Sequence, residues 1–439
     1  MKTVFVILIL LIFSGFLFSQ NPITPAGIYL ADPSAKVWND GHLYIYGSLD
    51  ESCEYYCSRR HHVMQTADMK NWIVFEDVFS SEGKNDEVDY NDELLYAPDC
   101  GFRNDTFFLY YCQPSRDQAE GVAFSDKPYG PFVAGKAMNT GEYQEIDPSV
   151  FMDDDGQAYY IWGQFSLKMA RLKPGMNGID GSTLRNGILT EEEHHFHEGA
   201  YMTKRNGIYY LVYADISRGE MPTCIGYATS SSPFGPYKYG GVIIDNDECN
   251  PGNWNNHGSI AEFKGQWYVF YHRSTHGCNM MRKACVEPIY FGPDGSIPEV
   301  EMTSQGAAEP FRKGEKIEAE QACILHGNVR IMAFSGNEEE LGMICDEDRA
   351  VYRYIEFTGA EKEIEIRLKA GRNGGTISAK LDKPWHQRIA EIEVQGSEGG
   401  GEWQTLSFKI EPADGIHAVY LEFYGDGEDL MEVDWFRFN

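Results

Sequence analysis

A hairpin-like pattern recurs five times between residues 32 and 273 of this 439-residue chain. Each copy has a polar head, a short apolar strand, a turn and then an aromatic strand. The turns, for example Asn206-Gly207 and Lys264-Gly265, carry the residues that tolerate the positive φ of a tight hairpin. The heads of the five copies are Asp32, Asp99, Asp147, Glu198 and His257. Such a repeat predicts one supersecondary unit used five times.

A second pattern, S-x-x-P-x-G-P, occurs in residues 124–132 and again in residues 229–237. Pro and Gly at fixed offsets end a strand and turn the chain, so each unit holds further strands outside its hairpin. Four-stranded units of about 50 residues that repeat around a circle form a β-propeller. We therefore predict an all-β chain with a five-bladed propeller over residues 20–304.

The five heads occupy equivalent positions of the repeat. Because the first strand of each blade lines the axis of a propeller, the heads should converge there. Four carboxyls and one imidazole would perturb one another's pKa values and keep at least one carboxyl protonated. A glycosidase needs such a pair, one carboxyl as acid and another as base. The alternative is that Asp and Glu only begin strands as polar turn residues, and five equivalent positions favour the site.

The net charge of the chain limits the classes of ligand that it can bind. The 37 basic and 67 acidic residues give a net charge of −30, which argues against nucleic acid or an anionic membrane surface. A neutral, polyhydroxylated ligand is compatible with this charge, and so is solubility alone. Aromatic residues make up 14% of the chain and suit both strand packing and contact with sugar rings.

The N-terminus reads as a secretory signal. Lys2 precedes an apolar run that ends at Phe18, and small residues follow. We predict cleavage near Ser19 and a secreted or periplasmic protein; an uncleaved anchor is the alternative, for which the run is short. No later segment is long and apolar enough for a membrane span. An even count of 10 Cys in a secreted chain predicts some disulfides. Cys53-x3-Cys57 lacks the second pair that a structural zinc site needs.

Residues 21–300 resemble glycoside hydrolase family 43, the five-bladed propeller hydrolases. The motifs that carry the resemblance are Asp32-Pro33-Ser34, Ala97-Pro98-Asp99, Asp147-Pro148-Ser149, His197-Glu198-Gly199, His257-Gly258-Ser259 and a late Arg282. The resemblance implies an inverting mechanism with Asp32 as general base and Glu198 as general acid. Asp147 would raise the pKa of Glu198 and position it.

The resemblance also implies binding residues. A calcium ion is expected on the axis near His257. Arg282 should contact the substrate, with Arg273 as the competing candidate, and Asp99 should line the same pocket. The family usually has Trp where this chain has Tyr96, and Pro where it has Ala200; both departures put the substrate in doubt more than the chemistry.

Two further groups lie near these motifs. Trp254 lies in a loop rich in Gly and Asn just before the fifth head, and could stack on a sugar. His194, His195 and His197 could suggest a metal cluster, but a pocket wall beside Glu198 is the better interpretation, because His-x-His needs other ligands to close a site.

Beyond a predicted linker at residues 305–316, residues 317–439 show alternating runs typical of a β-sandwich of jelly-roll type. This region resembles carbohydrate-binding module family 6 in Ile317-Glu318-Ala319-Glu320, in residues 400–405 and in Asp434-Trp435-Phe436. The resemblance implies a structural calcium on Glu318, Glu320 and Asp434, and a ligand cleft with Tyr354 and Trp385. The Asn usual in that cleft is not evident, so a purely structural domain is the alternative.

The sequence thus predicts a secreted, monomeric, inverting glycosidase that needs no cofactor for chemistry and acts on oligo- or polysaccharide. Within such a family, α-L-arabinofuranosidase is the first choice and β-D-xylosidase the second. Other furanosidases, such as a β-D-galactofuranosidase, and an endo-arabinanase are alternatives. A retaining sucrose- or fructan-cleaving propeller would instead use a nucleophilic carboxylate. A non-catalytic sugar-binding propeller would have lost one of the three acids, and all three are present.

Overall fold

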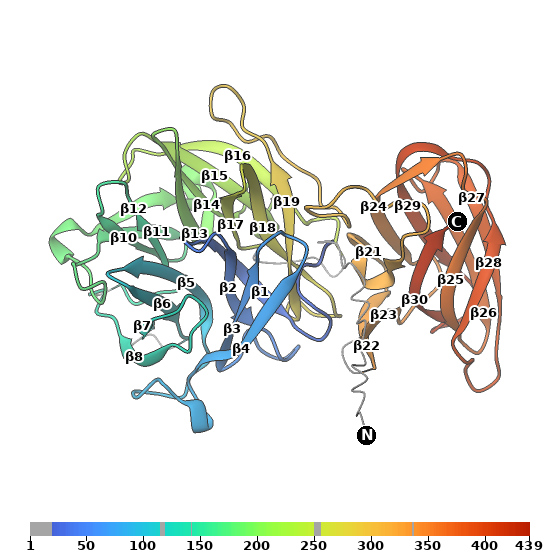
Figure 1. Cartoon of the computed structure of the whole chain (residues 1–439), viewed down its shortest axis with the longest axis horizontal. Helices are drawn as coiled ribbons and strands as arrows, with labels where there is room; N and C mark the ends of the chain where they lie inside the picture. Colours follow the sequence, from blue (N-terminus) through green and yellow to red (C-terminus); the bar gives the residue numbers. More distant parts are fainter. Residues whose placement is uncertain (1–19, 115–118, 142, 250–255, 336–337) are drawn as a thin grey trace, which may run out of the picture.

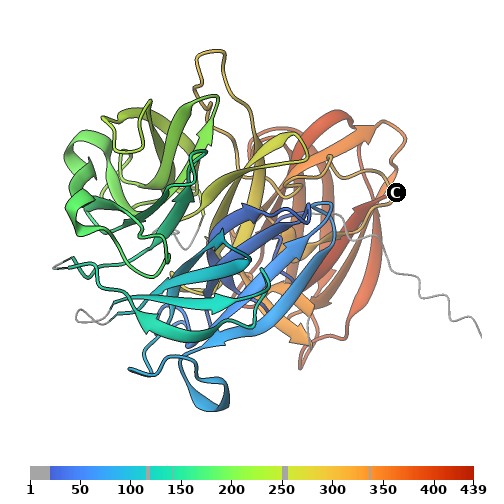
Figure 2. The same ribbon diagram turned by 60° about the vertical axis from the view of Figure 1, so that its left-hand side comes forward.

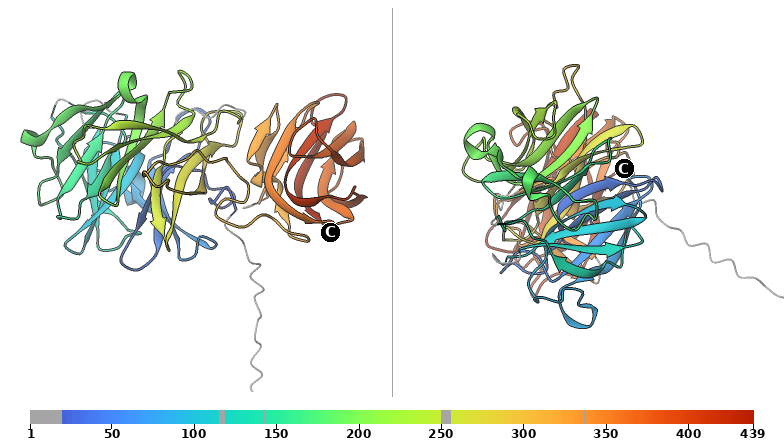
Figure 3. Two further views of the ribbon diagram at one scale, coloured as in Figure 1. Left: turned by 90° about the horizontal axis from the view of Figure 1, so that it is seen from above. Right: turned by 90° about the vertical axis from the view of Figure 1, so that its left-hand side faces the viewer.

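The computed structural model describes residues 20–114, 119–141, 143–249, 256–335 and 338–439. In these residues the regular secondary structure is almost entirely β-strand, apart from α1 (Glu191–His194) and short 3-10 turns. Figures 1 and 3 show a broad ring of sheets joined to a separate sandwich. The predicted signal peptide, residues 1–19, lies outside the described part. No helix among the described residues has both the length and the apolar character that crossing a membrane requires.

Five sheets form the ring in the part of the chain that the structure describes. The first contains β1 (Leu30–Val37), β2 (Leu43–Leu49), β3 (Arg60–Thr66) and β4 (Trp72–Ser80). The second contains β5 (Tyr96–Arg103), β6 (Thr106–Cys112), β7 (Glu120–Ser125) and β8 (Val133–Ala137). The third contains β9 (Ser149–Met152), β10 (Ala158–Trp162), β11 (Ser166–Arg171) and β12 (Arg185–Thr190).

The fourth sheet contains β13 (Phe196–Arg205), β14 (Ile208–Asp215), β15 (Cys224–Ser230) and β16 (Lys238–Asp245). The fifth contains β17 (Ser259–Phe263), β18 (Gln266–Ser274) and β19 (Arg282–Ile289). The first strands β1, β5, β9, β13 and β17 contact one another in turn around the axis (Figure 2). The prediction of a five-bladed propeller is confirmed.

Each blade places a tyrosine of its second strand in the hydrophobic clusters between neighbouring blades. These five side chains are fully buried, and each hydroxyl donates a hydrogen bond. They are Tyr46, Tyr110, Tyr160, Tyr210 and Tyr271. An aromatic ring fills a wide blade interface, while its hydroxyl finds a partner. The aromatic second strands of the repeat therefore build the core.

The N-terminal segment closes the ring. The backbone N–H of Ile23 donates to the carbonyl of Ala284 on β19, at 2.8 Å. The side chain of Asn21 both donates to the carbonyl of Val286 and accepts from its N–H. These bonds supply the outer edge of the three-stranded fifth blade, so the start of the described chain pairs with the last blade.

A disulfide also joins the first and last blades. Cys53, in the loop after β2, is bonded to Cys278, in the loop after β18. The prediction that some of the cysteines pair is confirmed by this bridge. Cys57, the other member of the Cys53-x3-Cys57 pair, is buried and carries a free thiol.

The C-terminal region is a sandwich of two antiparallel sheets. One has the order β22-β23-β30-β25-β28, with β20 beside β30, and the other has the order β21-β24-β29-β26-β27. The strands are β20 (Ile317–Glu318), β21 (Ile324–His326), β22 (Arg330–Ser335), β23 (Glu338–Gly342), β24 (Arg349–Thr358), β25 (Glu363–Ala370), β26 (Gly374–Leu381), β27 (Arg388–Gln395), β28 (Gln404–Lys409), β29 (Asp414–Tyr424) and β30 (Met431–Phe438).

The segment predicted as a linker, residues 305–316, contains no strand. It is nevertheless packed, because the side chain of Phe311 belongs to the sandwich core and its backbone bridges Ile355 of β24. A buried ion pair holds the domains together: Lys283 of β19 lies 2.6 Å from Glu339 of β23, and both side chains are almost fully buried.

Candidate active site

Local backbone geometry sets which head residues face the axis. The φ angles of Asp32, Ala97, Asp147 and Gly199 are 53°, 27°, 60° and 67°. In β1, β5 and β13 the strand pairing shifts at these points, as it does in a β-bulge. A bulge re-aims the side chains around it. The inner strands therefore turn selected polar groups toward one end of the axis.

Three of the predicted heads meet there with His257. The Nδ1 atom of His257 lies 3.7 Å from a carboxylate oxygen of Asp32 and 3.9 Å from one of Asp147. A Cβ on Gly199 would lie 2.7 Å from the imidazole ring, so glycine at this position lets His257 pack against the backbone beside Glu198. The structure thus brings Asp32, Asp147, Glu198 and His257 together; the three acids are buried, and the side chain of His257 is 14% exposed.

Asp32 is held in its charged form. Nη1 of Arg282 donates to one carboxylate oxygen at 3.0 Å, and the hydroxyl of Ser48 donates to the other at 2.6 Å. The backbone N–H of Asp32 donates to Nδ1 of His272. Burial opposes ionisation, but Arg282, His257 and His272, with the Ser48 hydroxyl, outweigh it and lower the pKa of Asp32 to about 2.

Asp147 lies in the opposite electrostatic environment. Burial and the charges of Glu198 and Asp32 raise the pKa of Asp147 well above its usual value. The sequence-based expectation placed the retained proton on Glu198. The structure shows the raised pKa on its neighbour Asp147. Nε2 of Gln164 donates to Glu198 at 2.7 Å and fixes its carboxyl group.

Arg282 bridges two carboxylates rather than facing open solvent. Its guanidinium donates to Asp50 through Nε and Nη2, at 2.8 and 3.0 Å, in addition to its contact with Asp32. The ring of Tyr56 lies 5.0 Å from the guanidinium carbon. With 1% of its surface exposed, Arg282 anchors Asp32, and its direct contact with substrate stays a prediction. Arg273, the competing candidate, is buried and donates to the carbonyl of Ala322 in the sandwich.

Asp99 is not part of the cluster, which corrects the expectation that all five heads converge; its place in the substrate pocket stays a prediction that its engaged carboxylate does not support. The bulge of the second blade is at Ala97, so the carboxylate comes two residues further along the strand. It is 1% exposed and accepts hydrogen bonds from Lys36, Ser34 and Ser149. A carboxylate with these partners is fully engaged below the cluster.

The described side chains around His257 do not form the ligand set that the expected axial calcium needs. Among the described residues, no group of three or more His, Cys, Asp and Glu side chains is arranged to hold a metal ion. The acid nearest along the axis, Asp99, already binds the ammonium of Lys36 at 3.0 Å. The donor set therefore does not fit a metal at this position.

Of the remaining residues predicted near the pocket, some lie beside the cluster and others do not. Tyr96 begins β5, is partly buried, and lies beside the thiols of Cys57 and Cys112; burial raises its pKa. His197 lies 4.0 Å from Glu198, in line with a pocket wall, whereas His194 is buried against the carbonyl of Tyr237. Trp254 lies outside the described residues.

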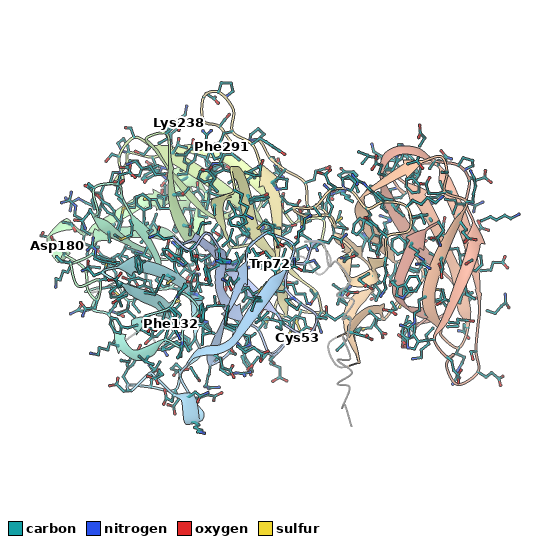
Figure 4. All side chains as sticks on the ribbon, in the orientation of Figure 1. Cys53, Trp72, Phe132, Asp180, Lys238 and Phe291 are labelled. Carbon is teal, nitrogen blue, oxygen red and sulfur yellow. A yellow bond between two sulfur atoms is a disulfide. The ribbon has the colours of Figure 1, made fainter. Side chains whose placement is uncertain are left out.

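In the sandwich, Glu318, Glu320 and Asp434 line one cavity of about 580 Å³ that also borders the propeller at Trp72, labelled in Figure 4. One oxygen of Glu320 is buried without a hydrogen-bond partner. Glu318 is paired with Lys316, and Asp434 with Arg367. One of the three expected calcium ligands is therefore unsatisfied, and the other two carry their own cations.

The two aromatic residues expected in a ligand cleft, Tyr354 and Trp385, line a second cavity of about 740 Å³. Glu248 and Glu301 of the propeller segment form part of its wall, so this cavity lies between the domains. Trp385 is 76% exposed, which is unusual for a side chain of this size.

The sequence analysis missed several residues that shape the site. They are Ser48, Asp50, Tyr56, Gln164 and His272. The polar alternation of Ser48 and Asp50 at the end of a buried strand was a usable signal. Gln164 lies in a tight turn and His272 within an aromatic strand, and neither position has a local pattern that indicates a role.

Comparisons with known proteins give matches over both domains. The family model of glycosyl hydrolases family 43 matches residues 19–297, and that of carbohydrate binding module (family 6) matches residues 318–439. A xylosidase/arabinosidase of Thermoclostridium stercorarium is 30% identical over 94% of this chain and 97% of its own.

Two solved structures are similar over much of their length. The crystal structure of a family 43 arabinoxylan arabinofuranohydrolase from Bacillus subtilis, with cellotetraose, is 26% identical, has a TM-score of 0.56, and matches 96% of this chain and 97% of that one. A β-xylosidase/α-arabinofuranosidase from a compost microbial metagenome, with xylotriose in a calcium-free form, is 27% identical, with a TM-score of 0.55 over 64% of this chain and 98% of that one.

Proposed function

The chain belongs to glycosyl hydrolases family 43 and carries a family 6 carbohydrate-binding module. We propose that it removes α-L-arabinofuranosyl units from xylan-type polysaccharide. It is a glycoside hydrolase that binds carbohydrate, and its family needs no cofactor for the chemistry. Release of β-D-xylosyl units is the second candidate, favoured by the xylosidase names among its relatives.

The proposed mechanism is a single displacement. Asp32, held as a carboxylate by Arg282, takes a proton from a water molecule on one face of the sugar ring. Glu198 donates a proton to the leaving oxygen on the other face. Asp147, beside Glu198, positions this acid and modulates it, as the sequence predicts.

One observation carries this proposal. Two carboxyl environments of opposite character meet within one cluster: the pKa of Asp32 is lowered to about 2, whereas that of Asp147, beside Glu198, is raised. Pairs of acids whose environments push their pKa values apart are typical of an acid and a base in catalysis. A non-catalytic sugar-binding propeller has no use for this separation.

Replacement of the proposed acid tests the assignment. We expect Glu198→Ala to lower kcat/KM on arabinoxylan oligosaccharides by about 10²–10⁴-fold, since the leaving oxygen then departs without a proton. The loss should be much smaller for an aryl glycoside whose leaving group needs no protonation. The measurement is a panel of natural and aryl arabinofuranosides, xylosides and galactofuranosides. Glu192→Ala, on α1, is the control and should behave as the parent.

The panel also separates the substrate alternatives. A parent preference for arabinofuranosides supports the first candidate, for xylosides the second, and for galactofuranosides another furanosidase. Release of long oligosaccharides from arabinan would indicate endo action. Near-parent activity of Glu198→Ala on natural substrates would rule out Glu198 as the acid.

We place calcium, expected from the sequence, in the sandwich rather than on the axis. The unpartnered oxygen of Glu320 supports this choice. Among the described residues the three acids are not arranged around one ion as they stand, so Glu318 and Asp434 would join as ligands on release of Lys316 and Arg367. An ion there would supply only structural charge compensation. Millimolar Ca²⁺ should raise the melting temperature of the parent but not of Glu320→Gln, with exposed Glu402→Gln as the control. An equal rise in all three proteins would contradict this site.

We further propose that the protein acts outside the cytoplasm after cleavage near Ser19, as a monomer. The apolar N-terminal run and the Cys53–Cys278 disulfide support the compartment, because disulfides persist in oxidising environments. The cluster of acids is complete within one chain, which supports the monomer. Mass spectrometry of the exported protein and light scattering would test these two statements.

A further inference from the structure

The axis of the propeller is filled, below the catalytic cluster, by the side chain of Lys36. Lys36 follows Asp32 by four residues on β1, a distance of about 13 Å along an extended strand. Its side chain is 12% exposed. Its ammonium donates to Asp99 at 3.0 Å and to the carbonyl of Val150 at 3.1 Å. It also lies 4.5 Å from the centre of the Tyr201 ring.

These contacts connect the inner strands of four blades. Lys36 belongs to the first blade, Asp99 to the second, Val150 to the third and Tyr201 to the fourth. The fifth blade reaches the same layer through Ser259, whose hydroxyl donates to the carbonyl of Pro33 and accepts from the backbone N–H of residue 35. The ammonium is thus at the point where the blades meet.

We propose that Lys36 is the resident cation of the propeller axis, in the place of a metal ion, and that it positions Asp32 and Asp147 through the strands that carry them. Asp99 is the counter-ion. The pair is neutral as it stands, so a divalent ion added to this buried layer would bring uncompensated charge, which is strongly unfavourable.

Electrostatics agree with a permanently charged ammonium. Burial opposes the charge on Lys36, but Asp99 and Tyr201 outweigh it and raise the pKa of Lys36. Lys36 also lines a cavity of about 310 Å³ between the inner strands. Loss of the side chain would therefore leave an anionic site that a small cation can enter.

The experiment uses the full chain on a Glu320→Gln background, which removes the proposed sandwich site. Metal content is measured by elemental analysis, and unfolding is followed with EDTA or Ca²⁺. We expect no stoichiometric metal and no shift with either reagent. Lys36→Ala should lower the melting temperature by about 5 °C and kcat by about tenfold or more, since one buried partner of the pair is left alone.

Ethylammonium should restore part of both losses in Lys36→Ala, whereas the neutral analogue propane should not. Lys36→Met, which keeps volume but not charge, should remain impaired. Lys204→Ala is the matched control, because Lys204 also binds an aspartate (Asp153) and lies over a tyrosine ring, but next to the hairpin turn at the end of β13. The melting temperature and kcat of Lys204→Ala should stay close to those of the parent, and neither should respond to ethylammonium.

Two results would overturn the proposal. One is a stoichiometric metal in the Glu320→Gln protein whose removal by EDTA lowers its melting temperature. The other is a Lys36→Met protein as stable and as active as its parent. If Lys36→Ala fails to fold, the metal content of the Glu320→Gln protein still decides. Metal content and unfolding do not depend on which sugar is cleaved, so they remain interpretable if the proposed substrate is wrong.

Discussion

At the scale of single residues, the site depends on what surrounds each carboxyl group. Asp32 and Asp147 are equally short acids at equivalent positions of the repeat, each with positive φ. Of these two acids only Asp32 accepts a hydrogen bond from Arg282, while Asp147 faces two other acids. Their pKa values therefore move in opposite directions, which is the condition for one to stay charged while the other keeps a proton near its partner.

Removal of Arg282 should convert Asp32 into an acid that titrates in the working range. In Arg282→Met the burial of Asp32 is opposed only by the histidines and Ser48, so its pKa rises from about 2. The base must be charged to act. As the pH is lowered, kcat/KM of the variant therefore begins to fall at a higher pH than kcat/KM of the parent. Profiles of kcat/KM between about pH 3 and 8 should show the acid limb shifted upward by about 1–2 pH units.

Arg218→Met is the matched control for that experiment. Arg218 also bridges two acids, Asp245 and Glu299, but at the surface. Its profile should overlay that of the parent. An Arg282→Met enzyme with lower activity but an unshifted acid limb would show that Arg282 does not set the charge of Asp32.

At the scale of elements, the ring is held at the junction of its first and last blades. The segment at Asn21 pairs with β19, and Cys53 bonds to Cys278. The loop that contains Cys53 also carries Tyr56 over Arg282. The same junction thus supports both the fold and one wall of the site.

Loss of the Cys53–Cys278 disulfide should lower the stability of the fold and loosen the wall of the site that carries Tyr56. We expect Cys53→Ser/Cys278→Ser to lower the free energy of unfolding by about 2–4 kcal/mol and to raise KM more than it lowers kcat, since Tyr56 becomes less restrained. Denaturant titration and steady-state kinetics measure the two effects. Cys345→Ser, which removes a free thiol in the sandwich, should leave both unchanged; an equal loss there would remove the special role of the bridge.

The strands and turns were largely predictable from the sequence, but the position of the bulge in the inner strand of the second blade was not. Repeat spacing and turn residues predict five blades, because hairpin chemistry is local. The position of a bulge within a strand depends on neighbours in space, so aligning Asp99 with Asp32 placed it in the wrong layer. Partners such as Asp50, Gln164 and His272 likewise act across strands, and no sequence spacing reveals them.

At the scale of the whole molecule, the sandwich is attached through the blade that supplies Arg282. Lys283, the next residue of β19, forms a buried ion pair with Glu339, and Glu339 also accepts a hydrogen bond from the hydroxyl of Tyr29. Successive strand residues point to opposite faces, so β19 presents one side chain to the site and the next to the sandwich. The sequence predicts a linker at residues 305–316 but not this docking, because composition indicates where strands stop and not what they pack against.

The central claim is a single displacement by Asp32 and Glu198. Proton NMR of the first product formed from an aryl α-L-arabinofuranoside, or an aryl β-D-xyloside, tests it most directly, because anomers are distinguished before they interconvert. The account predicts that the inverted sugar, β-L-arabinofuranose or α-D-xylose, accumulates first. Initial appearance of the retained anomer would mean a covalent intermediate on a nucleophilic carboxylate and would contradict the assignment of Asp32 as general base.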